Sequence, residues 1–348
     1  MELENNNIRF MDLFAGIGGF RKGLEEIGDY ESVFSSEIDE DARKTYLANY
    51  GEMPAGDITK IETKEIPDHD LLCAGFPCQP FSISGKRNGF DDTRGTLFYE
   101  ILRIAKEKRP EVLFLENVKF LLYHDKKRTF KVILDALEEE LGYHVSYEVL
   151  NASDFGLPQN RERIIIASKN KKFDFEPIVK CTEKREKVFL EKFLDEEGDF
   201  EYLDRDEYTL IENPKLQKSG LRFVGYRNKS IRKKGVKPGT KHLSRVHRQP
   251  NRIYDSKGVH PTIPAQETSG RFFIYVDGRV RKLTLDECYK IMGFEDFKRV
   301  SSKTEQYKQI GNAIAVPVVK AVGTEIKKQI FGVEVENIDS YRDIAVCL

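Results

Sequence analysis

Short apolar runs alternate with stretches of helical periodicity through the first half of the chain. The apolar runs, which predict buried strands, span residues 9–14, 33–36, 70–74, 111–115, 145–150 and 163–167. The helical stretches between them span residues 20–27, 40–50, 97–108 and 129–141. This alternation predicts an α/β fold with a doubly wound, mainly parallel sheet.

The alternation stops near Lys169, and the residues that follow are polar and punctuated by Gly and Pro. Helical periodicity returns only at residues 285–292 and 315–330. A chain of 348 residues can hold one large core and a second, smaller domain. We therefore expect a second domain to begin near Lys169.

Charge is distributed unevenly over this second region. The net charge of the chain is −1, which argues against a uniformly basic nucleic-acid binder. Acidic residues dominate from 183 to 212, whereas residues 213–254 contain many Lys and Arg and no acid at all. Such a run is often only a solvated face, but its length and lack of acids favour contact with a polyanion.

Composition excludes several classes of protein. Hydrophobic residues make up 39% and charged residues 33%, and no apolar run approaches the roughly 18 residues that span a membrane. The polar N-terminus, MELENNNIRF, has no secretory signal. The 5 cysteines are scattered without metal-ligand spacing, which predicts a reduced, cytoplasmic protein with no metal.

Cys78 lies in the stretch AGFPCQPFSISGKR, directly after an apolar run. The Gly, Pro and Ser residues around it build loops, and a loop at the carboxyl end of a strand is where an open α/β sheet places its chemistry. Most free cysteines are instead small buried residues. From this stretch alone, Cys78 is either a nucleophile or a core residue.

A Gly-rich turn, FAGIGG, follows the first apolar run. Gly16, Gly18 and Gly19 let backbone approach a ligand closely, although the spacing is not the dinucleotide fingerprint GxGxxG and a purely structural turn remains an alternative. Glu37, after the second strand, is placed to accept from ribose hydroxyls, and Asp57 could accept an adenine amino group. Because these turns contain no basic residue, the pattern favours a nucleoside without phosphates.

Glu116 and Arg163 also fall at the ends or edges of predicted strands, on the same edge as Cys78, and Arg161 lies two positions before Arg163. A nearby Arg favours the thiolate form of a cysteine, and a Glu can protonate or hydrogen-bond a substrate. Equally, these residues could form an ordinary ion pair at the surface.

Nine motifs in order resemble the bacterial DNA cytosine-5 methyltransferases of restriction–modification systems. They are DLFAGIGGF, SEIDEDA, GDI, GFPCQPFSISGKR, DTRGTLFYEILRI, LFLENV, QNRERIIIA, RKLTLDECYKIMGF and YKQIGNAIAVPVV. The resemblance runs from about Arg9 to Gly323. It implies methyl transfer from S-adenosylmethionine, which becomes S-adenosylhomocysteine, to C5 of cytosine.

The resemblance also implies residue roles. Cys78 would attack C6 of a cytosine flipped out of the duplex, because C6 is inaccessible inside the base stack. Glu116 would contact N3 and the exocyclic amine, and Arg163 would hold O2, with Arg161 beside it. The implied cofactor residues are Phe14, Gly16, Ile17, Gly19, Glu37, Ile38, Asp57, Ile58, Pro77, Leu97 and Asn312. At Ile38 some members carry an aromatic residue instead.

Further residues are expected to contact DNA. RQPNRIY and HPTIPAQETSGR resemble the two recognition loops of the family, and Gln249 would fill the space left by the flipped cytosine. The full set is Ser82, Ser84, Lys86, Arg87, Gln249, Arg252, Thr262 and Gln266. The basic run would supply phosphate contacts. His242, His247 and His260 are interpreted as phosphate or loop residues rather than metal ligands.

The implied architecture is a Rossmann-like class I methyltransferase sheet with a smaller, mostly β or irregular target-recognition domain. We expect the catalytic domain at 1–175 plus 300–348, the target-recognition domain at 176–284 and a hinge at 285–299. A monomer acting on double-stranded DNA is expected, with a cognate restriction endonuclease as partner system. An enzyme acting on transfer RNA, or an inactive DNA-binding protein, is the alternative.

Overall fold

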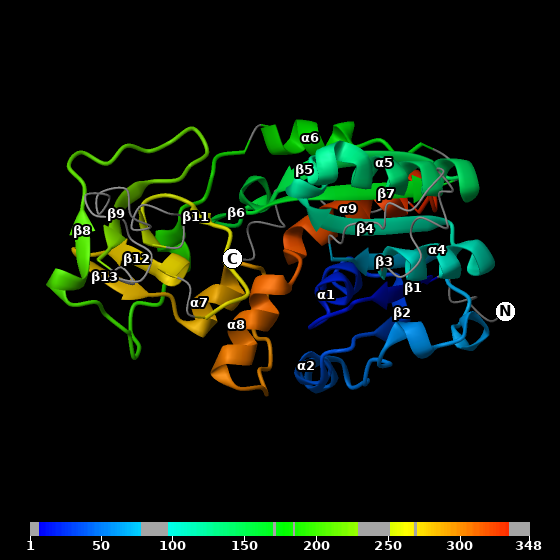
Figure 1. Ribbon diagram of the computed structural model, residues 1–348, viewed down its shortest axis with the longest axis horizontal. Coiled ribbons are helices and arrows are strands. Elements are labelled where there is room, and N and C mark those ends of the chain that lie inside the picture. Colours follow the sequence, from blue (N-terminus) through cyan, green and yellow to red (C-terminus); the bar gives the residue numbers. More distant parts are fainter. Residues whose placement is uncertain are drawn as a thin grey trace.

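The structure is a computed structural model that describes residues 7–77, 97–169, 172–183, 185–228, 251–267 and 270–333. It contains a six-stranded sheet of order β2-β1-β3-β4-β7-β5 and a five-stranded sheet of order β13-β12-β10-β9-β8. The two sheets lie at opposite ends of the molecule, with α7 and α8 between them (Figure 1).

The strands of the large sheet are β1 (Ile8–Leu13), β2 (Tyr30–Ser36), β3 (Leu71–Gly75), β4 (Val112–Val118), β5 (His144–Asn151) and β7 (Glu162–Lys169). The α-helices are α1 (Gly19–Glu25), α2 (Glu40–Tyr50), α4 (Leu97–Lys108), α5 (Arg128–Asp135), α6 (Glu176–Glu183), α7 (Leu285–Lys290), α8 (Lys303–Asn312) and α9 (Val316–Gln329). The prediction of a doubly wound α/β fold is confirmed.

The direction of the strands brings several chain segments to one edge of this sheet. β1 pairs in parallel with β2 and β3, and β3 pairs in parallel with β4. β7 runs antiparallel to β4, with Val118 opposite Arg163. The carboxyl ends of β1, β3 and β4 therefore meet the beginning of β7.

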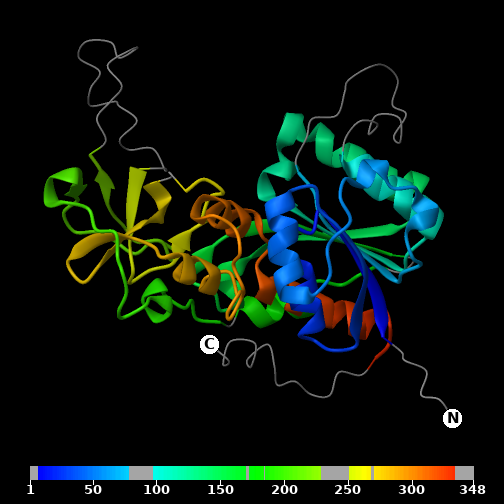
Figure 2. The same ribbon diagram turned by 90° about the horizontal axis from the view of Figure 1, so that it is seen from below.

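Alternating side chains of each strand enter two different cores. On β1, Phe10 packs in the cluster that contains α1 and α9, whereas Met11 and Leu13 pack in the cluster that contains α4 and α5. Figure 2 shows α4 and α5 on one side of the sheet and α9 on the other. Both faces are covered, which explains why the strands read as nearly continuous apolar runs.

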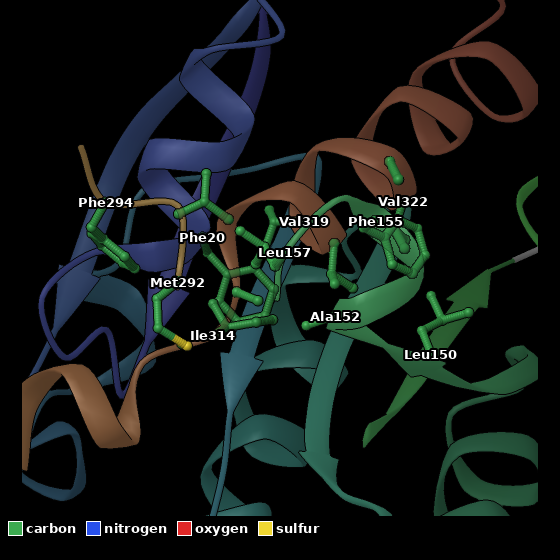
Figure 3. Close-up of a cluster of buried hydrophobic side chains, with 14 of the residues drawn as sticks. Phe20, Leu150, Ala152, Phe155, Leu157, Met292, Phe294, Ile314, Val319 and Val322 are labelled. Carbon is green, nitrogen blue, oxygen red and sulfur yellow. The ribbon is translucent and has the colours of Figure 1, made fainter. Parts of the chain in front are cut away.

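The C-terminal helix returns to the first strand–helix unit. Val319 of α9 packs close to α1, because a Cβ atom on Gly23 would lie 2.6 Å from its Cγ1. The Tyr30 hydroxyl donates to the Gly323 carbonyl at 2.8 Å. Figure 3 shows Phe20 of α1 among the side chains of this core, with Ile314 and Val319. The domain boundaries at 175, 284 and 299 stay predictions.

The small sheet forms where the sequence predicted mostly β or irregular structure. Its strands are β8 (Tyr208–Leu210), β9 (Phe223–Arg227), β10 (Arg252–Asp255), β12 (Phe273–Val276) and β13 (Arg279–Lys282). A separate parallel bridge joins β6 (Gln159–Asn160) to β11 (His260–Pro261). Within the described ranges, no helix is long and apolar enough to cross a membrane.

Candidate active site

A cavity of about 400 Å³ opens at the sheet edge where β1, β3 and β4 end and β7 begins. Its volume falls in the range of small-molecule sites. Its wall consists of Phe14, Ala15, Gly16, Ile17, Gly19, Phe20, Glu37, Asp39, Ala42, Gly75, Phe76, Pro77, Glu116, Asn117, Val118, Arg161, Arg163, Lys308, Gln309, Gly311, Asn312, Ala313 and Ile314. We call its two sides the Gly16 end and the Glu116 end.

The turn after β1 shapes the Gly16 end. Phe14 and Gly16 have positive φ angles of 58° and 56°, so the backbone turns sharply at the strand end. A Cβ atom on Gly18, whose φ is 85°, would lie 2.4 Å from the ring of Tyr50. Glycine is thus required at Gly18 by packing as well as by backbone conformation.

Glu37 joins the first two strand ends. Its carboxylate accepts from the backbone N–H of Gly16 at 2.8 Å and from that of Asp39 at 2.8 Å. Each oxygen keeps acceptor capacity that faces a cavity, which suits the hydroxyl groups of a ribose. Ile38, next to it, is 72% exposed.

Lys308 is the cation nearest Asp39 at this end. Its ammonium group donates to Asp39 at 2.5 Å and to Glu305 at 3.0 Å. Burial raises the pKa of Asp39, but the bond from Lys308 and the backbone N–H groups of α2 outweigh it and lower the pKa overall. Lys308 is neutralised by these acids, so the Gly16 end offers a ligand little free positive charge.

At the Glu116 end, the carboxylate of Glu116 pairs with Arg163, with Oε1 2.7 Å from Nε. Both side chains are largely buried, at 13% and 14% exposed. Gly75 is the register partner of Glu116, and a Cβ atom there would lie 3.4 Å from Glu116 Oε2. A carboxylate and a guanidinium thus stand together at the cavity wall.

Asn117 fixes the chain just before Cys78. Its Nδ2 donates to the carbonyl of Phe76 at 2.6 Å, and its Oδ1 accepts from the N–H of Val118 at 2.8 Å. The side chain is 2% exposed. Because Phe76 and Pro77 line the cavity, this bond sets where the polypeptide leaves β3 beside Glu116.

Arg161 is buried rather than a surface residue, at 2% exposed. Its Nη2 donates to the carbonyls of Gly311 at 3.1 Å and Ala313 at 2.7 Å. Its Nε and Nη1 are buried without a partner, and burial lowers the pKa of its guanidinium well below the usual value. Arg161 thus holds the two residues that flank Asn312.

The structure brings most predicted site residues to one cavity, but not all. Asp57 caps the turn at Ile58–Lys60, with Oδ1 accepting from the N–H of Thr59 at 3.1 Å, and it is not part of the wall. Ile58 is buried in the core on the α4 side, and Leu97 begins α4, also outside the wall.

Of the residues predicted to contact DNA, the structure describes three, and the others lie outside the described ranges. Thr262 donates its hydroxyl to the Asn160 carbonyl at 2.8 Å, and Gln266 is exposed. The Arg252 guanidinium lies over the ring of Phe223. The predicted DNA contacts outside the described ranges are Ser82, Ser84, Lys86, Arg87 and Gln249. Cys78, the predicted nucleophile, lies outside them as well.

His260 differs from its interpretation as a phosphate or loop residue. Its ring is fully buried, with Nδ1 2.6 Å from the Pro261 carbonyl and Nε2 2.8 Å from that of Arg271. It therefore belongs to the bridge between the two sheets. His242 and His247 lie outside the described ranges.

Sequence reasoning missed four polar residues of the wall: Asp39, Asn117, Lys308 and Gln309. Asn117 adjoins Glu116 and Asp39 lies two positions after Glu37, so proximity in sequence was an available signal for both. Lys308 and Gln309 precede Asn312 by four and three positions on the same helix, so proximity was a signal there too, although the pairing of Lys308 with the distant Asp39 had none.

Only one acidic cluster with metal-ligand spacing occurs in the described part of the chain. It consists of Asp39, Asp41 and Glu305. Lys308 already bonds two of these carboxylates. The cluster is thus explained by an internal ion pair.

The family profile of C-5 cytosine-specific DNA methylases matches residues 8–328. The chain is 40% identical over 333 residues to the type II methyltransferase M.HhaI of Haemophilus parahaemolyticus, covering 92% of this chain and 94% of that protein. It is 43% identical over 324 residues to M1.ScrFI of Lactococcus lactis subsp. cremoris, covering 91% and 77%. This chain belongs to the C-5 cytosine-specific DNA methylase family.

Solved structures agree on the fold. A Dnmt2 methyltransferase of S. pombe superimposes with a TM-score of 0.67 at 19% identity, covering 92% of this chain and 99% of that one. A putative DNA modification methyltransferase encoded within an E. coli prophage gives 0.63 at 19% identity, covering 94% and 100%. The protein is thus a cytosine-C5 DNA methyltransferase of the type found in type II restriction–modification systems.

Proposed function

We propose that the protein transfers a methyl group from S-adenosylmethionine to C5 of a cytosine flipped out of double-stranded DNA, through a covalent bond between Cys78 and C6. The observation that carries this proposal is the single cavity with Glu37 at one end and the Glu116–Arg163 pair at the other. The Gly16 end suits a nucleoside, and the Glu116 end suits a polar base.

The residues of the Gly16 end fit the cofactor. Glu37 retains acceptor capacity for ribose hydroxyls, and Phe14, Ile17 and Phe20 offer apolar wall. Lys308 is neutralised by Asp39 and Glu305, which suits a ligand without phosphate. When bound, S-adenosylmethionine supplies the methyl group and leaves as S-adenosylhomocysteine.

The Glu116 end would activate the base. Addition of the Cys78 thiolate to C6 breaks the C5–C6 double bond and moves its electrons onto C5, which becomes nucleophilic while part of the negative charge is shared with N3. Glu116 would hydrogen-bond N3 and the amine, and Arg163 would bind O2. After methylation, loss of the C5 proton to water expels the sulfur and restores the aromatic ring.

Arg161 would act through its neighbours rather than on the base. Its bonds to Gly311 and Ala313 fix the loop that carries Asn312 into the cavity wall. Arg161 is therefore proposed as a positioning residue for the cofactor. The Arg161→Lys variant, which can keep one of these bonds, should bind S-adenosylhomocysteine more tightly than Arg161→Met.

A protective role is the biological part of this proposal. The relatives it resembles are named type II methyltransferases, so methylation would shield host DNA from a cognate restriction endonuclease. Bisulfite sequencing of a host genome that expresses the chain would identify the target sequence.

The test compares methylation of plasmid DNA and of transfer RNA by the wild type and by Cys78→Ser. We expect methylated plasmid with the wild type and none with the variant, while calorimetry shows S-adenosylhomocysteine binding by both. Methylated transfer RNA with untouched plasmid, or full activity of Cys78→Ser, would refute the proposal.

A further inference from the structure

Exposed aromatic and basic side chains begin where the cavity wall ends. Val118, the last residue of β4, lines the cavity and is 39% exposed. Phe120 and Tyr123 follow it and are 62% and 56% exposed. Lys126 and Lys127 come next and are exposed as well. We call Phe120, Tyr123, Lys126 and Lys127 the rim surface.

The rim surface is anchored to the Glu116 end of the cavity. Val118 is the register partner of Arg163 across the β4–β7 ladder. One residue further, the Lys119 ammonium pairs with the Glu162 carboxylate at 2.7 Å. The short helix η3 (Lys119–Leu122) is therefore tied to the start of β7, beside the residues proposed to hold the base.

The backbone beneath the two lysines is held in an unfavourable conformation. Asp125, Lys126 and Lys127 have successive φ angles of 45°, 55° and 73°. Each left-handed residue other than glycine costs about 1 kcal/mol or more, and such strain concentrates at functional sites. No glycine relieves the strain here, so the chain retains two lysines at positions where their backbone is disfavoured.

The electrostatic surroundings of these lysines remain positive. Among the described residues, no acid pairs with Lys126 or Lys127. The adjacent Asp125 pairs with Arg128 at 2.5 Å, and Lys131, further along α5, pairs with Asp135 at 3.0 Å. The first turn of α5 contains no acidic residue and its N-cap, Lys127, makes no side-chain capping bond. The helix N-terminus therefore adds its own positive potential to that of the lysines.

We infer that the rim surface binds the sugar–phosphate backbone of the duplex next to the nucleotide that enters the cavity. Lys126 and Lys127 would contact phosphates, and the rings of Phe120 and Tyr123 would cover the apolar faces of neighbouring sugars. This inference rests on the proposed function, because it takes duplex DNA as the substrate. Its continuity with the cavity wall and its unpaired positive charge distinguish it from an ordinary solvated face.

The test measures the salt dependence of DNA binding. The double variant Lys126→Gln/Lys127→Gln should bind a labelled duplex of mixed sequence about tenfold more weakly at low salt. Its slope of log K against log salt concentration should be shallower by about 2, since two phosphate contacts are lost. The control Lys131→Gln/Lys180→Gln removes two exposed lysines that pair with acids of their own helices, and should leave the slope unchanged.

A second variant, Phe120→Ala/Tyr123→Ala, tests the aromatic half. We expect a severalfold higher KM for DNA, with unaltered binding of S-adenosylhomocysteine. An unchanged salt slope in the lysine variant, with cofactor binding intact, would overturn the inference. Loss of self-association by the aromatic variant with normal DNA affinity would also overturn it, assigning the surface to contacts between copies. Plasmid methylation by the wild type reports separately on the proposed function.

Discussion

The two ends of the cavity hold their carboxylates in different ways. At the Gly16 end, Glu37 accepts from two backbone N–H groups, which are fixed by the turn after β1 and by the start of α2. At the Glu116 end, Glu116 is held by the side chain of Arg163. A backbone donor cannot leave its acceptor without refolding, whereas a guanidinium can rotate.

This difference indicates that the two ends of the cavity have different functions. The Gly16 end is complete before any ligand arrives, so binding there costs little reorganisation. At the Glu116 end, an ion pair satisfies both partners, and the proposed base would have to replace it. The four predictions that follow test this contrast, from the largest expected effect to the smallest.

The largest effect is expected from Glu116→Gln. The substitution keeps the size of the side chain but removes the charge that pairs with Arg163 and the acid proposed to bind N3. We expect kcat for plasmid methylation to fall about 100-fold or more, since a positioned acid–base group contributes about that much. Calorimetry should show unchanged S-adenosylhomocysteine binding.

Glu162→Gln is the matched control for that variant. Glu162 is exposed, adjoins Arg163 in sequence and pairs with Lys119 rather than with a wall residue. Its kcat should stay within about twofold of the wild type, because surface pairs contribute little. Equal losses in both variants would contradict a special role for the Glu116–Arg163 pair.

At the Gly16 end, we expect a substitution to weaken cofactor binding rather than to lower kcat. Glu37→Gln presents an amide NH₂ to one of the two backbone N–H groups, so one hydrogen bond is replaced by two opposed donors. We expect S-adenosylhomocysteine to bind about 10- to 100-fold more weakly, which corresponds to the ~2 kcal/mol that a hydrogen bond to a charged group contributes. At saturating cofactor, kcat should be nearly normal.

Asp57→Asn provides the comparison for Glu37. Asp57 was predicted from the sequence to contact the cofactor, but it caps a turn outside the cavity wall. Its variant should bind S-adenosylhomocysteine like the wild type. A loss of affinity as large as that of Glu37→Gln would instead support the cofactor contact that the sequence predicted for Asp57.

A smaller effect, on stability, is expected from Asp12 below the Gly16 end. Asp12 is fully buried with both oxygens unpartnered, and burial, with the nearby charge of Glu37, raises the pKa of its carboxyl well above the usual value. Because the folded-state pKa exceeds the unfolded value of about 3.9, the acid favours folding at low pH and loses that contribution as pH rises.

Asp12→Asn should therefore gain stability relative to the wild type as pH increases from about 4 to 8, by about 1 kcal/mol. Urea unfolding at several pH values measures this difference. Asp68→Asn should instead differ from the wild type by a constant amount over this range, with the difference vanishing as pH falls below about 4, since the bond from Lys108 lowers the pKa of Asp68. A pH-independent difference for Asp12→Asn would contradict a neutral buried acid.

The smallest effect is expected at Ile38, which stands exposed beside Glu37. An aromatic ring there can stack on a flat heterocycle, and such contacts contribute about 0.5–1.5 kcal/mol. Ile38→Trp should therefore tighten S-adenosylhomocysteine binding about three- to tenfold by calorimetry. Unchanged affinity would place the adenine away from Ile38.

Local pattern was sufficient to predict the large sheet and part of the site. Apolar runs marked each strand. Glu37 could be placed because it directly follows β2, and Glu116 because it lies near the end of β4. The cofactor role of Asp57 stays a prediction, and sequence spacing did not reveal that its carboxylate also caps the turn at Thr59.

Contacts between distant segments escaped prediction. Arg161 looked like a possible surface residue, since its partners Gly311 and Ala313 lie about 150 positions away. The five strands of the small sheet were expected only as a mostly β or irregular region, because their short runs carry little periodicity. Burial, which decides such cases, depends on the whole fold.

The short bridge between β6 and β11 has a mechanical consequence. Gln159 and Asn160 pair with His260 and Pro261, and Gln159 also bonds Ile263 and Ile291. Arg161 and Arg163 follow within the same few residues of chain. A displacement of the small sheet would therefore be transmitted through this short segment to β7, the strand that carries Arg163. Because this connection is only a few residues long, it couples the small sheet, which is predicted to contact DNA, to the sheet edge that carries the proposed catalytic residues.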